Sequence, residues 1–143
     1  MAKTRVFLDT NVLLRYLQRG TPEKLLAPST LENVTYVINP VVLQELLLAT
    51  RAKSQVDWQQ LVKDFEIDAI DGSIFDNADV KRLLDVRNRA VHSSDFLIMA
   101  SAATSNCDYL LSYDLDILRA SDEGAKYTAM TPDDFVAMLE ESA

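Results

Sequence analysis

Short apolar runs alternate along the chain with longer segments in which apolar residues recur at helical spacing. The apolar runs predict strands at about 4–9, 34–38, 66–70, 108–112 and 126–130. The periodic segments predict helices at about 11–19, 22–33, 40–53, 57–66, 73–89, 95–105 and 132–141. Strands separated by helices indicate right-handed βαβ units. We therefore expect an α/β fold, a three-layer α/β/α sandwich with a mainly parallel central sheet.

Local signals mark the starts of several of these helices. Thr21 precedes Pro22, Asn39 precedes Pro40, and the pair Ser93–Ser94 precedes a strongly apolar helix. Only three glycines occur, and no repeat or long linker divides the chain. The pattern predicts one domain over residues 1–143.

Composition narrows the class of protein. With 48% hydrophobic residues the chain can bury a real core, and no apolar run approaches the ~20 residues that a membrane span needs. Cys107 is the only cysteine, which excludes an internal disulfide and a cysteine-rich zinc site. The first residues show no signal-peptide pattern. We expect a cytoplasmic protein.

The charge balance opposes simple binding to nucleic acid. Fourteen Lys and Arg against 22 Asp and Glu give a formal net charge of −8. A role on phosphate polymers therefore requires a local basic patch, a metal ion, or both. Otherwise the excess acid only maintains solubility.

Two acidic segments follow predicted strands, where ligands bind in open parallel sheets. Asp9 ends the first strand, and Asp114 and Asp116 follow the strand at 108–112. Asp9 could form a helix cap or an Asx turn, but Thr10 and Asn11 could cap equally well. Asp114 and Asp116 could be ordinary turn residues.

Two further acids lie early in predicted helices. Glu45 has almost only apolar neighbours, so its helix should be mostly buried, and a buried carboxylate is costly unless it is compensated. Alternatively, Glu45 lies on a solvent-exposed edge of this helix and needs no compensation. Asp95 lies in the first turn of a helix, where the helix dipole alone would favour an acid.

Taken together, these acids predict a metal site. Asp9, Glu45, Asp95 and Asp114 would meet at one edge of the sheet and repel one another unless a divalent cation neutralised them. Oxygen ligands without histidine or cysteine favour Mg²⁺ or Mn²⁺ over zinc. Such sites activate a water molecule and stabilise charge on a transferring phosphorus.

The same residues carry a family resemblance. The stretches VFLDTNVLL, NPVVLQEL, SSDFLIMASAATSNCDYLLSYDLDI and YTAMTPDDF, in this order, cover essentially the whole chain. With them the chain resembles a PIN domain, the small metal-dependent nuclease fold of VapC-type toxins in toxin–antitoxin pairs.

The resemblance implies roles for individual residues. Asp9, Glu45, Asp95 and Asp114 would be catalytic and hold one or two ions of Mg²⁺ or Mn²⁺, with Asp116 helping nearby. Thr10 and Asn11 match the residues after the first aspartate, and Ser112 would support Asp9 by a hydrogen bond. Asn106 stands where the family commonly has glycine, but Asn also tolerates left-handed backbone geometry.

The implied function is an endoribonuclease that cuts RNA with a metal-activated water and needs no side-chain nucleophile. His92 is the only histidine, so a scheme with two histidines is excluded. By resemblance, an antitoxin protein would cover the site with a basic helical segment, and the chain would form a homodimer. Leu13, Leu14 and Leu17 beside Leu25 and Leu26 could form the dimer face, although core packing explains them equally well.

Basic residues needed for RNA occur in clusters rather than throughout. Arg15 and Arg19 share a helix face, Arg51 and Lys53 end the Glu45 helix, and Lys81, Arg82, Arg87 and Arg89 precede Asp95. Many such clusters are only solvated faces. We expect Arg15, Arg87 and Arg89 to contact RNA, because the last two approach the acidic pocket.

Other function classes can be weighed against this one. A haloacid dehalogenase-type phosphatase needs a second aspartate two positions after the first, where this chain has Asn11. No phosphate-binding glycine motif occurs. The remaining alternative is a non-catalytic PIN domain that binds RNA or protein, whose expected mark is a lost acid, and here all four are present.

Overall fold

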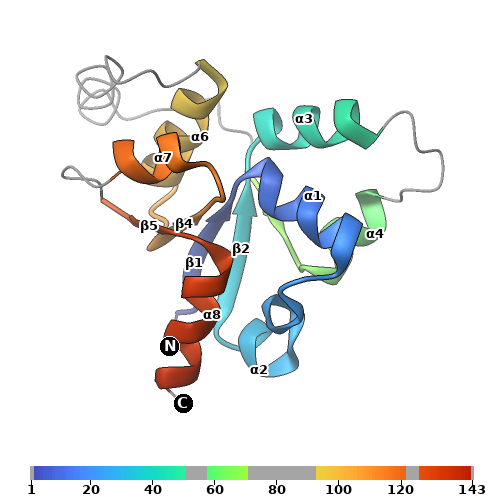
Figure 1. The fold of residues 1–143 in the computed structure, drawn as a ribbon, viewed down its shortest axis with the longest axis vertical. Coiled ribbons are helices and arrows are strands. Elements are labelled where there is room, and N and C mark those ends of the chain that lie inside the picture. The colour runs from blue at the N-terminus through green and yellow to red at the C-terminus, as the bar shows by residue number, and fades with distance from the viewer. Residues whose placement is uncertain (1, 51–57, 71–92, 122–125, 143) are drawn as a thin grey trace.

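A parallel five-stranded sheet forms the centre of the protein (Figure 1). The computed structural model describes residues 2–50, 58–70, 93–121 and 126–142. The strands are β1 Thr4–Leu8, β2 Val34–Ile38, β3 Asp68–Ala69, β4 Tyr109–Leu111 and β5 Thr128–Met130. Their order is β3-β2-β1-β4-β5, and each neighbouring pair is parallel. The expected α/β fold with its parallel sheet is confirmed.

The helices follow the strands in alternation, as the sequence predicts. Their bounds are α1 Thr10–Arg19, η1 Glu23–Leu26 (a 3-10 helix), α2 Pro28–Leu31, α3 Pro40–Thr50, α4 Trp58–Asp64, α6 Ser93–Thr104, α7 Leu115–Ala120 and α8 Pro132–Glu141. Gly20 ends α1 in the left-handed conformation, at φ 66°, which glycine adopts without steric cost. The predicted helix at 73–89 and the end of the one at 40–53 lie outside the described residues.

Alternating side chains of the strands assign the helices to the two faces of the sheet. On one face, the Tyr36 hydroxyl donates a hydrogen bond to the carbonyl of Leu25 in η1, and its ring packs edge-on against Phe65 after α4. On the same face, Tyr109 packs against Phe135 of α8. Arg5 points to the other face, where α6 ends. Helices thus cover both faces, as a three-layer sandwich requires.

The strand order positions the candidate site. From β1 the chain proceeds outward to β2 and β3, and it then crosses back to β4 on the other side of β1. The order therefore reverses between β1 and β4, and ligands of open α/β sheets bind at the carboxyl ends of the strands at such a point. Asp9 and Ser112 directly follow these two strands.

Apolar side chains from all layers pack into one core. The largest of those fully removed from solvent include Tyr36, Phe7, Phe65 and Phe135. Leu13 and Leu25 are also fully buried, and Leu14, Leu17 and Leu26 pack against the core from partly buried positions. Of the two explanations for these leucines, core packing accounts for them within a single chain.

The prediction of one continuous helix at 22–33 is wrong. This segment is divided into η1 and α2 at Ala27, whose backbone is extended at φ −59° and ψ 139°. The cause is Pro28, because the proline ring disfavours helical geometry in the residue before it. Pro28 then occupies the first turn of α2, where its missing N–H costs nothing.

Helix α7 is absent from the prediction, which treats 114–116 as a turn. In the structure Asp114 is its N-cap and accepts a hydrogen bond from the N–H of Asp116 at 2.8 Å. A six-residue helix gives too short a periodic signal to separate from a loop. The start of α6 also differs, since Ser93 and Ser94 lie inside the helix rather than before it.

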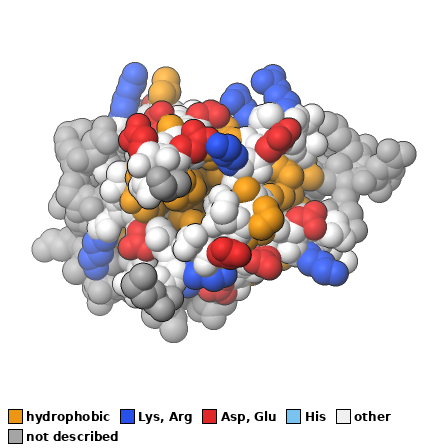
Figure 2. All heavy atoms as spheres, turned by 90° about the horizontal axis from the view of Figure 1, so that it is seen from below, with side chains coloured by type: hydrophobic (Ala, Val, Ile, Leu, Met, Phe, Trp, Pro, Cys, Tyr) orange, Lys and Arg blue, Asp and Glu red, His pale blue; other side chains and the backbone are white. Residues whose placement is uncertain are grey.

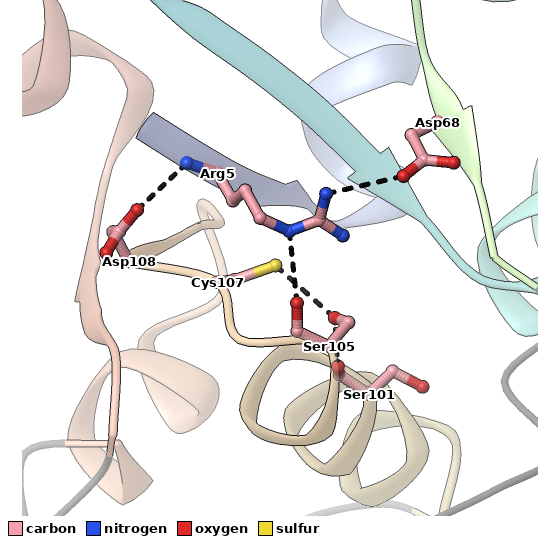
Figure 3. A network of polar contacts seen from close by, with 6 residues as sticks. All are labelled: Arg5, Asp68, Ser101, Ser105, Cys107 and Asp108. Carbon is pink, nitrogen blue, oxygen red and sulfur yellow. Dashed lines mark hydrogen bonds and ion pairs between the residues drawn. The ribbon is translucent and has the colours of Figure 1, made fainter. Parts of the chain in front are cut away.

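A polar network at the amino end of the sheet joins three elements (Figure 3). The Arg5 guanidinium donates to the carbonyl of Ser105 after α6 at 3.0 Å and contacts Asp68 of β3 at 3.4 Å. The Arg5 backbone N–H donates to the carboxylate of Asp108 at 2.9 Å. Asn106, which lies between Ser105 and Asp108 in the sequence, has a φ of 57°. Asparagine thus adopts the left-handed conformation at the position where PIN domains commonly have glycine. This network fixes the end of α6 that lies far from Asp95.

The end of the molecule with the two termini and α2 has a mixed surface (Figure 2). On its described part, acidic and basic side chains alternate around apolar ones, so this face has no uniform positive charge. Among the described residues, no helix has the length and hydrophobicity to cross a membrane.

Candidate active site

Asp9 lies at the carboxyl end of the central strand β1 and is only 5% exposed. Its backbone N–H donates to the carbonyl of Leu111, so the strand pairing with β4 extends to this residue. Asp9 is also the N-cap of α1, and its Oδ1 accepts from the Thr10 N–H at 2.7 Å. The expectation that Thr10 or Asn11 could cap equally well is wrong, because Thr10 already begins the helix.

The second oxygen of Asp9 is held by two side chains. The buried Ser112 hydroxyl donates to Oδ2 at 2.7 Å, and the Asn11 amide donates to the same atom at 3.1 Å. The pairing of Leu8 with Leu111 explains this contact, since it brings the next residue of each strand side by side. Both carboxylate oxygens of Asp9 are thus fixed in orientation by hydrogen bonds.

Asn11 and Ser112 also organise the loop after β4. The side-chain oxygen Oδ1 of Asn11 accepts a hydrogen bond from the Tyr113 N–H at 3.0 Å, and the Ser112 hydroxyl accepts one from the Asp114 N–H at 3.0 Å. Asn11 further donates to the Ser112 hydroxyl at 3.2 Å. The loop carrying Asp114 is therefore tied to the same residues that orient Asp9.

Glu45 lies on α3, and its side chain is half-buried. The expectation that this helix is mostly buried is wrong: only Val42, Leu46 and Thr50 are buried, while Leu48 is 56% exposed. The helix is covered along one side, where it contacts α1 and α6, and Leu47 and Leu48 lie on its exposed side. Glu45 Oε1 is nevertheless buried and has no hydrogen-bond partner in the part of the chain that the structure describes.

Asp95 is half-buried in the first turn of α6, as the sequence predicts. Helices α6 and α3 contact each other, so the elements that carry Asp95 and Glu45 are neighbours. The dipole of α6 favours a negative charge at this position.

Electrostatics links three of the acids. Burial raises the pKa of Asp9 to about 6; the hydrogen bonds from Ser112 and Thr10 lower it, while the negative charges of Asp95 and Glu45 raise it. Burial also raises the pKa of Glu45, and the charge of Asp95 adds to this, partly offset by the Thr10 hydroxyl. Asp9, Glu45 and Asp95 therefore act on one another although they come from distant parts of the sequence.

Asp114 and Asp116 have a different local role from these three. Asp114 caps α7 through its carboxylate, and Asp116 is exposed in the first turn of that helix. Both lie at the same edge of the sheet as Asp9, but the negative charges that raise the pKa of Asp9 belong to Asp95 and Glu45. The sequence left open that Asp114 has only a local structural role in a turn. In the structure it has such a local role, as the N-cap of α7.

The donor chemistry of the site fits a hard divalent cation. Its ligating atoms are carboxylate oxygens, and buried acids with raised pKa values gain when a cation neutralises them. The Oε1 atom of Glu45 lacks a partner that a cation would supply. As the side chains lie here, however, no three Asp, Glu, His or Cys residues within the described ranges are grouped closely enough to hold one ion. Coordination of one ion by three acids would require the carboxylates of Glu45 and Asp95 to move closer to that of Asp9, which hydrogen bonds hold in place.

Of the basic residues expected to contact RNA, only Arg15 is described. Its guanidinium lies over the ring of Tyr113, 4.0 Å from the ring centre, and Tyr113 directly follows Ser112. The sequence reasoning does not single out Tyr113; its place between two site residues is the signal that would have identified it. Arg87 and Arg89 lie outside the described residues, as do His92 and the other basic clusters at 51–53 and 81–82.

From the sequence, Asn39 is expected only to cap the helix that follows it. In the structure its buried amide contacts α6 as well as α3. The signal is the alternation of β2, which places Thr35, Val37 and residue 39 on one face.

Comparisons with known proteins agree with this fold. The model of the PIN domain family matches residues 6–123, and the chain belongs to this family. No curated protein matches the sequence significantly.

Several solved structures share the fold at low sequence identity. The structure of VapBC2 from Rickettsia felis, bound to a DNA fragment from its promoter, has a TM-score of 0.64 and 17% identity, covering 90% of this chain and 98% of that one. VapBC-1 from nontypeable Haemophilus influenzae has a TM-score of 0.57 and 14% identity, covering 90% and 98%. FitAB bound to a DNA fragment has a TM-score of 0.54 and 16% identity, covering 89% and 94%. These neighbours are toxin–antitoxin complexes.

The raised pKa of Asp9 predicts a specific dependence of stability on pH in metal-free buffer. Folding raises this pKa from 3.8 to about 6, so the folded chain binds more protons between these values and the free energy of unfolding falls as pH rises from about 4 to about 6. The contribution of Asp9 is about 3 kcal/mol, at ~1.4 kcal/mol per pKa unit. Asp9→Asn should lose this contribution, so its free energy of unfolding should fall less than that of wild type as pH rises from about 4 to about 6.

Urea unfolding between pH 4 and pH 7 measures this difference. Glu32→Gln, at an exposed carboxylate after α2, is the matched control and should keep the wild-type profile. Parallel profiles for wild type and Asp9→Asn would show that Asp9 carries no folding-linked proton.

Proposed function

We propose that this PIN domain is a Mg²⁺- or Mn²⁺-dependent endoribonuclease and the toxin of a toxin–antitoxin pair. The observation that carries the nuclease proposal is the electrostatic coupling of three carboxylates from β1, α3 and α6 at the point where the strand order reverses. A fold gains no stability from gathering acids that repel one another, so the arrangement is explained by a cation that the site takes up.

In this proposal Asp9, Glu45 and Asp95 hold the cation, and Asp114 and Asp116 assist from the loop after β4. When bound, the cation would lower the pKa of an attacking water and offset negative charge on the phosphate. The chain's own contribution is preorganisation: Ser112 and Asn11 fix the oxygens of Asp9, so this carboxylate needs no reordering before it binds. Thr10 binds Asp9 through its backbone N–H, and its hydroxyl lowers the pKa of Glu45.

A non-catalytic PIN domain that binds RNA or protein is the alternative. The observation in its favour is that no three acids in the described ranges already stand close enough to hold one ion. The two functions differ in one respect, the cleavage of RNA when metal is supplied.

The nuclease proposal predicts cleavage of RNA that depends on Mn²⁺. Chain stripped of metal with EDTA should leave a single-stranded RNA intact and should cut it once Mn²⁺ is restored. Asp9→Asn and Glu45→Gln should each lower the cleavage rate by at least about 100-fold, because each removes a ligand charge. Gel analysis of labelled RNA measures the rate.

Glu32→Gln serves as the control for this assay as well and should cut at the wild-type rate. RNA that stays intact at every Mn²⁺ concentration, while still binding to the chain, would favour the non-catalytic module.

Arg15 is the described residue that we propose as an RNA contact. It is half-buried, its guanidinium is held against Tyr113, and Tyr113 is bonded through its N–H to Asn11 beside Asp9. A cation stacked on an aromatic ring is held in place at low entropic cost and can still bind phosphate. Because the formal net charge of the chain is −8, RNA binding depends on individual basic residues near the site rather than on overall charge.

Arg15→Ala, made in the inactive Asp9→Asn background, should weaken RNA binding. The slope of log K against log salt should become shallower by about one, since one phosphate contact is lost. Fluorescence anisotropy at several salt concentrations measures both quantities. Arg119→Ala, at an exposed position in α7, is the control; equal effects of the two substitutions would contradict a specific contact by Arg15.

The toxin role is supported by the family and by the structural neighbours, which are toxin–antitoxin complexes. We propose an antitoxin partner that covers the acidic site with basic side chains, and a homodimer of this chain.

Expression of the chain without a partner should arrest bacterial growth, because its RNA cleavage would be unrestrained. Asp95→Ala should relieve the arrest while the protein still accumulates. Growth curves with immunoblots measure both effects. Unimpeded growth with soluble wild-type chain would contradict the toxin role and leave the nuclease proposal in place.

A further inference from the structure

Asn39 lies between the two helices that carry Glu45 and Asp95. It follows β2, precedes Pro40 at the start of α3, and is only 3% exposed. Alternation along β2 places residue 39 on the same side as Val37, which pairs with Phe7. Arg5 shares this face with Phe7 and reaches the end of α6, so the Asn39 side chain is directed toward α6.

The amide of Asn39 uses its two ends on different helices. Its carbonyl oxygen accepts from the Val42 N–H in the first turn of α3 at 3.0 Å. Its nitrogen donates to the Ser101 hydroxyl at 2.8 Å and to the Leu97 carbonyl at 3.4 Å, both in α6. One buried side chain thus caps α3 and also anchors it to α6.

These contacts lie close in sequence to the acids. Glu45 is three residues after Val42, and Asp95 is two residues before Leu97. We propose that Asn39 is a positioning residue that sets the distance between Glu45 and Asp95 for cation binding. This inference rests on the proposed nuclease function, and it adds a residue that touches neither cation nor RNA.

The chemistry of asparagine explains why it stands here. Serine, threonine or aspartate would cap α3 equally well through an oxygen. Asparagine differs because its acceptor and its donor are on two separate atoms, so it can cap one helix and reach a second helix at the same time. A serine hydroxyl also accepts and donates, but from a single atom on a shorter side chain. A metal site tolerates errors in ligand position of only about 0.5 Å. The contact between two helices that carry ligands must therefore be rigid.

Two substitutions weaken the connection while keeping the cap. Asn39→Ser retains an oxygen for the Val42 N–H, but we expect its shorter side chain not to reach Ser101 at the same time. Ser101→Ala removes the nearer of the two acceptors on α6 and leaves Asn39 intact. Thr50→Val is the matched control: it removes a buried hydroxyl at the other end of α3, which donates to carbonyls of its own helix.

Isothermal titration with Mn²⁺ gives the dissociation constant of each variant, and urea unfolding in EDTA gives its stability. We expect Asn39→Ser and Ser101→Ala to raise the Mn²⁺ dissociation constant by about tenfold or more. The double variant should be no weaker than Asn39→Ser alone, because both changes break one connection. Thr50→Val should lower the unfolding midpoint and leave Mn²⁺ binding within about twofold of wild type.

Unchanged Mn²⁺ affinity in Asn39→Ser and Ser101→Ala would overturn the positioning role and leave the nuclease proposal standing. An equal loss of affinity in Thr50→Val would also overturn it, because general loosening would then explain the effect. If the wild-type chain binds no Mn²⁺, both the positioning role and the metal-dependent function are overturned together.

Discussion

The burial of one carboxylate, Asp9, near two others at the end of β1 is the constraint that the rest of the site depends on. Asp9 is buried, and the charges of Glu45 and Asp95 add to the cost of ionising it. The hydrogen bonds from Ser112, Asn11 and the Thr10 N–H offset part of this cost and fix the carboxylate in one orientation. A chain that maintains such an arrangement gives up stability at neutral pH, which is typical of a functional site.

The parallel sheet supplies the positions that this arrangement requires. The reversal of strand order places the ends of β1 and β4 side by side, and helices α1, α3 and α6 contact one another in sequence around that edge. The buried amide of Asn39 connects two of those helices, while Arg5 fixes α6 at the opposite edge. The acids are thus held by a rigid scaffold rather than by loops, as preorganised binding requires.

Much of this was predictable, because periodicity and strand ends are local signals. The five strands and the parallel sheet follow from short apolar runs between helices, and Asp9 and Glu45 stand out as acids beside apolar segments. The break at Ala27 and helix α7 were missed, since each depends on a few residues rather than on a period. The second bond of Asn39 and the ring contact between Arg15 and Tyr113 join distant segments. The sequence places Asn39 and Tyr113 beside site residues, but it does not show which distant side chain each one contacts.

The most direct test of the account is the location of Mn²⁺ in crystals of the metal-soaked protein, identified by anomalous scattering. The account predicts an ion within about 2.0–2.6 Å of carboxylate oxygens from Asp9, Glu45 and Asp95, with the Asp9 bond to Ser112 retained. Crystals soaked at saturating Mn²⁺ that show no ion at this edge of the sheet, or an ion bound by Asp9 alone with Glu45 turned away, would contradict it.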